Sequence, residues 1–176
     1  LQITSSMDIG EHPGCNRGNL YILSNADSVR MYKNDRFIKE YRPEMSPYKH
    51  LKHGPILIDD FIGDALEKNE RFRPKHAKEM ADAMNIVARG SLNHIPKRLY
   101  PTALKLVLLY HIDFAEVTKL YTKYIGDWGG TATVYRFDAI KNGKVIKSVT
   151  KEPVNGIRLQ AEADHTNLTE HHSYDV

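Results

Sequence analysis

The spacing of apolar residues changes twice along this chain of 176 residues, and these changes constrain its fold most. Up to residue 56, short apolar runs are separated by Gly, Pro, Asn and Asp, as is typical of β-strands and turns. Between residues 57 and 126, apolar residues recur at steps of three and four, which indicates helices. From Trp128 onward the spacing returns to two. The sequence therefore predicts an α+β fold in which about four helices stand between two strand regions.

The first strand region contains two strands and a third behind a tight turn. An apolar run at 20–23 is followed by a polar break and then by Val29 and Met31, which alternate with polar residues. Asn34 and Asp35 come next, and this pair is acceptable where both turn residues need positive φ. A further edge strand is expected within residues 1–6, and another is expected to begin at Lys49, before Gly54-Pro55 breaks it.

The second strand region contains the clearest hairpin. Residues 131–140 and 144–150 flank Asn142-Gly143, the preferred pair for a type I′ turn. Strands that are distant in sequence can share a sheet when the segment between them has its own core and its ends lie close together. The sequence thus predicts an antiparallel β-sandwich with a helical insertion. The expected parts are the discontinuous sandwich (1–56 and 127–162), the helical insertion (57–126) and a polar tail (163–176).

Four helices are expected within the insertion. The clearest begins at Pro74, has apolar residues at helical spacing and ends at Gly90. Another begins at Pro101, and because it is apolar on nearly every side we place it at the centre of the helical core. A third is expected to begin at Asp59-Asp60, since acidic residues suit a helix N-terminus. The fourth begins near Asp113, where Glu116 completes a pattern like a capping box.

Two of these segments resemble known sequences. The first resembles the strand pair that opens an immunoglobulin-like β-sandwich domain in family 2 glycoside hydrolases of the β-galactosidase type. The residues that match are Tyr21, Ser24, Asn25, Asp27, Val29 and Asn34. The match departs at Asp35, where Gly is usual, so the turn is less ideal. Residues 133–150 resemble the closing hairpin of the same domain, and the tail resembles the lead-in to a further sandwich domain.

The resemblance implies an immunoglobulin-like domain that follows a catalytic barrel in a multidomain hydrolase. The catalytic glutamates of that family belong to a separate (β/α)₈ barrel, and nothing in this sequence matches such a segment. Glu152-Pro153 lacks the Asn-Glu context of the family's acid. We therefore expect no catalytic residue here, and we expect a scaffolding role against the barrel and neighbouring domains. The family does not explain the helical insertion, because its sandwich domains usually lack so large a helical segment.

Two alternative functions remain open. The first is a carbohydrate-binding module, for which the ten tyrosines would have to supply an aromatic platform, although their spacing mostly fits core or strand positions. Trp128, the one tryptophan, is the candidate binding residue, because a ring flanked by Gly129-Gly130 can stack on a sugar. We favour the other interpretation of Trp128, which is that it fills the junction between helices and sandwich. The second alternative is a protein-interaction module in which the helical insertion presents a groove to a peptide.

No metal or cofactor is expected. The densest group of possible ligands lies in the polar tail, which offers little regular scaffold. Its members are Asp164, His165, Glu170, His171, His172 and Asp175. His50 and His53 lack a third ligand nearby, and the single Cys15 excludes an internal disulfide framework. His12 could activate the Cys15 thiol, but a free, partly buried thiol is the simpler interpretation.

Composition narrows the classes of partner. The chain is 41% hydrophobic and 27% charged, as in soluble globular proteins, and it has no apolar run of the roughly 18 residues that a membrane span requires. Residues 17–54 carry eight basic against four acidic residues. Their spacing of three between Arg30 and Arg42 puts successive charges on opposite faces of a strand, so we expect a solvated surface and no nucleic-acid partner. The chain starts without Met, as expected for a segment of something longer, and the compartment stays open.

Overall fold

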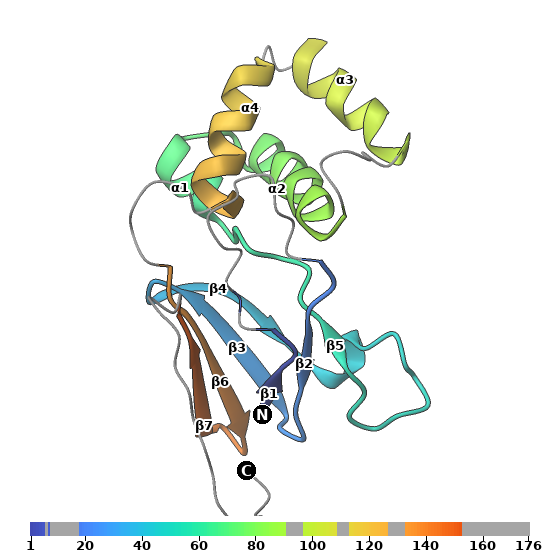
Figure 1. Cartoon of the computed structure of the whole chain (residues 1–176), viewed down its shortest axis with the longest axis vertical. Coiled ribbons are helices and arrows are strands. Elements are labelled where there is room, and N and C mark those ends of the chain that lie inside the picture. The colour runs from blue at the N-terminus through green and yellow to red at the C-terminus, as the bar shows by residue number, and fades with distance from the viewer. Residues whose placement is uncertain (6, 8–17, 91–96, 109–112, 127–132, 153–176) are drawn as a thin grey trace, which may run out of the picture.

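The protein is α+β, as the sequence predicts. The computed structural model describes residues 1–5, 7, 18–90, 97–108, 113–126 and 133–152. These residues form seven strands in two antiparallel sheets, together with four α-helices (Figure 1). The helices lie at one end of the molecule and both sheets at the other (Figure 1). Within this described part, no helix is both long enough and apolar enough to cross a membrane.

The larger sheet joins strands that precede the helices in the sequence to strands that follow them. Its strands, in the order β4-β3-β6-β7 across the sheet, are β4 (Arg36–Tyr41), β3 (Ser28–Lys33), β6 (Tyr135–Lys141) and β7 (Lys144–Lys151). The register places Met31 of β3 opposite Phe137 of β6, and both side chains are fully buried. The prediction that these distant segments share one sheet is confirmed. The burial is consistent with this pairing, since β3 and β6 both place apolar side chains in the one hydrophobic cluster.

The smaller sheet has the order β1-β2-β5, with β1 (Gln2–Ile3), β2 (Tyr21–Leu23) and β5 (Ile56–Leu57). The edge strand expected within residues 1–6 is confirmed as β1. The prediction of a strand from Lys49 is wrong. Residues 49–53 are exposed and form turns, and β5 begins only after Pro55. Burial accounts for the difference, since Ile56 and Ile58 are buried whereas Leu51 is exposed.

Both expected hairpin turns have the predicted backbone. Asn34 and Asp35 have φ of 47° and 60°, and Asn142 and Gly143 have φ of 52° and 73°. The Asn34 side chain also accepts a hydrogen bond from the Val134 amide at 2.8 Å, which ties the first turn to the strand region that follows the helices. Asp35 therefore adopts the conformation in which the resembled family has Gly.

Gly143→Ala should lower the free energy of unfolding by about 1 kcal/mol, because a residue with a side chain adopts positive φ only at a cost. A Cβ at this position would meet no atom within 4 Å, so the loss comes from the backbone alone. Urea unfolding measures it. Gly90→Ala is the matched control: Gly90 has φ of −89° and an added Cβ would come no closer than 3.5 Å to a neighbour, so it should cost clearly less. Equal losses would contradict the turn assignment.

The helices are α1 (Ala65–Glu70), α2 (Pro74–Arg89), α3 (Tyr100–Leu108) and α4 (Phe114–Tyr121), and α4 continues into the π-helical turn η3 (Thr122–Gly126). Single 3₁₀ turns lie at η1 (Pro43–Met45) and η2 (Lys97–Leu99). The prediction for α2 is confirmed from its first-turn Pro74 to Gly90. Asp113 caps α4, and its carboxylate accepts a hydrogen bond from the Ala115 amide at 3.2 Å.

The helix expected to begin at Asp59-Asp60 is wrong. The Asp60 carboxylate accepts hydrogen bonds from the amides of Ile62 and Gly63, at 2.9 and 3.0 Å, and so closes a turn. Gly63 then has φ of 60°, which a right-handed helix does not allow. The helix therefore begins later, at Ala65.

The placement of α3 at the centre of the helical core is also wrong. Leu104 and Leu108 are each 60% exposed, and Tyr100 is 59% exposed. The helix packs against α2, where Lys105 Nζ lies 2.5 Å from Glu79 Oε1, and it forms the far end of the molecule (Figure 1). A helix that is apolar on nearly every side must expose part of that surface when one neighbour covers it.

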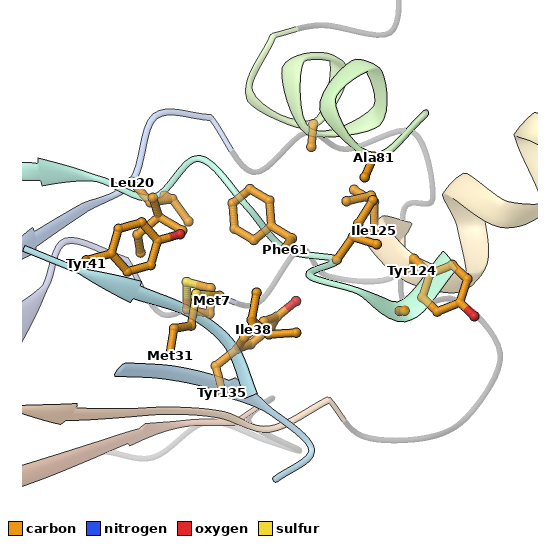
Figure 2. Close-up of a cluster of buried hydrophobic side chains, with 14 of the residues drawn as sticks. Met7, Leu20, Met31, Ile38, Tyr41, Phe61, Ala81, Tyr124, Ile125 and Tyr135 are labelled. Carbon is orange, nitrogen blue, oxygen red and sulfur yellow. The ribbon is translucent and has the colours of Figure 1, made fainter. Parts of the chain in front are cut away.

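One hydrophobic cluster joins the helices to the strands. Phe61 is fully buried and lies between Tyr41 of β4 and Ile125 of η3 (Figure 2). Leu57, which was expected to open the insertion, pairs with Tyr21 in the smaller sheet. The division of the chain into domains at 57 and 126 stays a prediction.

Glu70 links α1 to η3 through two short hydrogen bonds. Lys123 Nζ and the Tyr124 hydroxyl each donate to its carboxylate, at 2.6 Å. These bonds, that from Lys123 first, hold the pKa of the Glu70 carboxyl below its usual value of 4.5. The carboxylate form is thus favoured in the folded protein.

The contribution of Glu70 to stability should disappear in acid. Because its folded pKa is lowered, that contribution is fully present above pH 4.5 and is lost as the pH falls through the lowered value. Lys123 is more than half exposed, so the contribution at neutral pH should be below about 1 kcal/mol. Urea unfolding of wild type and Glu70→Gln from pH 7 to pH 3 tests this. The two stabilities should converge in acid, and a constant difference would contradict it.

Candidate functional site

A cleft of 340 Å³ lies between β4, α1 and α2. Its buried floor comes from Ile38 of β4 and from Ala77 and Ala81 of α2. Its exposed rim carries one aromatic ring and several charged groups. The rim residues are Phe37, Asp64, Glu67, Lys78 and Asp82. The cleft therefore combines an apolar base with a largely charged rim.

A buried amide fixes one wall of this cleft. Asn85 of α2 is 4% exposed, and its Nδ2 donates to Asp60 Oδ1 at 2.9 Å. Its Oδ1 accepts from the Phe61 amide at 3.0 Å. The same Asp60 oxygen closes the turn before α1, so one pair of side chains sets the turn against α2.

A close approach of two backbones fixes the opposite side. A Cβ on Gly63 would lie 3.2 Å from the Cα and the carbonyl oxygen of Ile38. The turn can therefore pack this tightly on β4 only with glycine, whose positive φ it also requires.

The charges of the rim are mostly paired. Asp64 accepts from Arg36 at 2.6 Å and contacts Lys68 at 2.5 Å. These partners, Lys68 first, hold the pKa of the Asp64 carboxyl below its usual value. Lys78 lies 3.5 Å from Asp82 on the next turn of α2. Among the described residues, Glu67 is the rim carboxylate that makes no hydrogen bond or ion pair.

Phe37 links the cleft to the outer face of the larger sheet. Its side chain is 48% exposed, and its ring meets that of Tyr32 edge-on, with centroids 5.8 Å apart. The Arg136 guanidinium lies 4.3 Å from the centroid of the Tyr32 ring. A row of planar groups therefore crosses β4, β3 and β6 next to the cleft.

Ion pairs also lie on this outer face. Arg30 and Arg42 both donate to Glu40, at 2.9 and 2.8 Å, and the bond from Arg30 is the main cause of a lowered pKa of the Glu40 carboxyl. On β6, Asp138 accepts from the Ser148 hydroxyl at 2.7 Å. Of the basic residues of the first strand region, Arg30, Arg36, Lys39 and Arg42 are thus held in pairs with acidic ones.

The predicted site residues do not form this site. Trp128 lies outside the described residues, so its roles in sugar stacking or at the junction stay predictions. Cys15, His12 and the histidines of the tail also lie outside them. His50 and His53 are described and exposed, and no group of three possible metal ligands occurs in the described part of the chain.

Sequence reasoning missed the cleft, although one signal for Phe37 was present. Phe37 and Ile38 are adjacent apolar residues in a strand, where successive side chains point to opposite faces, so one of them is expected to face away from the core. The register shift between Met31 and Tyr32 turns Phe37 outward, opposite Tyr32. Asp64 and Glu67 carried no such signal, because exposed acidic residues at a helix start are ordinary.

Comparison of the chain with protein-family models, with curated proteins and with solved structures finds no match.

Proposed function

We propose that the chain is a non-catalytic accessory domain of a multidomain glycoside hydrolase resembling the β-galactosidase type of family 2. One observation carries this proposal. The two segments that carry the resemblance supply neighbouring strands of one sheet, with β3 paired to β6 along its whole length. In this proposal the two sheets are the layers of an immunoglobulin-like sandwich, and the helical cluster is an addition to it.

The role of the domain is scaffolding against the catalytic barrel and neighbouring domains. β7 is an edge strand of the larger sheet, and Val145 and Ile146 are 57% and 54% exposed on it. An exposed apolar edge favours association with another chain segment unless something covers it. A neighbouring domain of the parent chain is the proposed cover.

The reading frame that surrounds this segment tests the proposal most simply. We expect it to encode a (β/α)₈ barrel upstream, with the two catalytic glutamates of a retaining enzyme. The chain alone should not hydrolyse a chromogenic galactoside. An upstream region without such a barrel, or turnover by this chain alone, would contradict the proposal.

Within the parent enzyme, Val145→Asp should lower the temperature of inactivation, because it would bury a charge at the proposed contact. Lys144→Asp is the matched control on the same strand, next to the turn. If both variants leave the inactivation temperature unchanged, β7 does not face a neighbouring domain.

A second candidate function, a protein-interaction module, is favoured by α3. Tyr100, Leu104 and Leu108 are spaced by four residues and therefore lie along one side of the helix, where each is exposed. Such a side can dock against an amphipathic partner peptide. Selection from a peptide library tests this: peptides that bind the wild type and lose binding to Leu104→Glu would support it, and no selected peptide with that dependence would contradict it.

A further inference from the structure

We infer that the cleft between β4, α1 and α2 binds a neutral saccharide. This inference goes beyond the accessory role and does not depend on it, because it rests on the cleft alone. The volume of 340 Å³ lies at the lower end of the range of small-ligand sites, about 300–1,000 Å³. A site of this size suits one or two sugar units.

The cleft offers an apolar surface of the kind that sugar rings contact. Phe37 leaves about half of its side chain exposed at the rim, and Pro74 together with the floor residues Ala77 and Ala81 lines the part of the cleft formed by α2. One face of a pyranose carries C–H groups, and an aromatic ring packs against such a face through its apolar surface. Phe37 is therefore the expected stacking residue.

The charges of the rim favour a neutral ligand with many hydroxyl groups. Asp64 is bonded to Arg36 and Lys68, and Asp82 lies 3.5 Å from Lys78, so an incoming cation would have to compete with partners already in place at these two carboxylates. Hydroxyl groups can donate to the carboxylates and accept from the cations without breaking these pairs. Glu67, whose carboxylate makes no bond within the described part of the protein, is the expected main acceptor.

The walls are held in position before any ligand arrives. Asp60 and Asn85 fix the turn against α2, and Gly63 packs directly on Ile38 of β4. A site that is organised in advance loses less conformational entropy on binding. The backbone of the walls is therefore in place before a ligand binds.

The test is a titration of the labelled chain with galactose, glucose, mannose and lactose, followed by amide chemical shifts. We expect shifts at Phe37, Glu67 and Lys78 with at least one of these sugars. Phe37→Ala should weaken binding at least about tenfold, equivalent to about 1.4 kcal/mol. Glu67→Gln, which keeps size and removes charge, should weaken it less.

Glu116→Gln on α4 is the matched control, because Glu116 is exposed and does not line the cleft, and it should bind like the wild type. The inference is overturned if no sugar shifts these amides, if Phe37→Ala binds as the wild type does, or if calcium or spermidine shifts them and sugars do not. An upstream reading frame without a barrel would end the accessory role and leave this result unaffected.

Discussion

Phe61→Ala is expected to lower the free energy of unfolding by about 3–5 kcal/mol, the usual cost of truncating a fully buried aromatic side chain. Phe61 lies where the helical cluster meets the strands, between Tyr41 and Ile125 (Figure 2). The substitution would leave a cavity between both parts. Because domains of this size are stable by about 5–15 kcal/mol, the loss is a large share of the total. Urea unfolding followed by circular dichroism measures it.

Phe37→Ala is the matched control for this prediction. It removes the same atoms from a half-exposed position whose contact with Tyr32 is worth about 0.5–1.5 kcal/mol. The loss should therefore be no more than about 1.5 kcal/mol. Similar losses for Phe61→Ala and Phe37→Ala would mean that Phe61 does not lie in a core shared by helices and strands.

Asp60→Ala should cost about 2–4 kcal/mol, because it removes a charged acceptor from three donors. These are the amides of Ile62 and Gly63 and the Nδ2 of Asn85, all within 3.0 Å of one carboxylate oxygen. Asn85 is buried, so its donor would lose its partner without gaining water. Thermal and urea unfolding both report the change.

The adjacent residue supplies the control for Asp60. Asp59 pairs with Lys39 at 2.8 Å, but both side chains are about a third or more exposed, so Asp59→Ala should cost at most about 1 kcal/mol. Asp60→Asn keeps an acceptor oxygen and should lose less than Asp60→Ala. If Asp59→Ala costs as much as Asp60→Ala, the turn before α1 is not held as described.

The strands at the centre of the larger sheet were predictable because local rules determine them. Asn142-Gly143 favours a tight hairpin turn and so predicts β6. Val29 and Met31 alternate with polar residues and so predict β3. Each of these two central strands could therefore be predicted from a short stretch of sequence. The pairing of these strands was predictable only because both regions have apolar residues at a spacing of two and both resemble parts of the same type of domain. The α2 helix was equally clear, since Pro74 and Gly90 mark its ends.

The errors arose where one residue has two possible uses. Asp60 next to a helical pattern favours a helix start, but its carboxylate instead bonds the turn amides, and the helix begins at Ala65. The α3 helix is apolar on nearly every side, so its sequence does not indicate which side remains exposed in the structure. Exposure of Leu104 depends on how α3 packs against α2, which is set by the tertiary structure.

The cleft could not be predicted from the sequence because three separated segments form it. Phe37, Glu67 and Lys78 come from a strand and two helices, and each is ordinary where it stands. Their proximity depends on the Asp60–Asn85 bond and on the contact of Gly63 with β4. Neither contact leaves a pattern along the chain.

The central claim is that β3, which precedes the helices in the sequence, pairs with β6, which follows them. Backbone nuclear Overhauser effects test this pairing most directly. In the labelled chain we expect cross-strand backbone contacts between Arg30 and Asp138 and between Met31 and Phe137. Contacts from β6 to β7 without any to β3 would contradict the claim, because the hairpin would then stand apart from the first strand region.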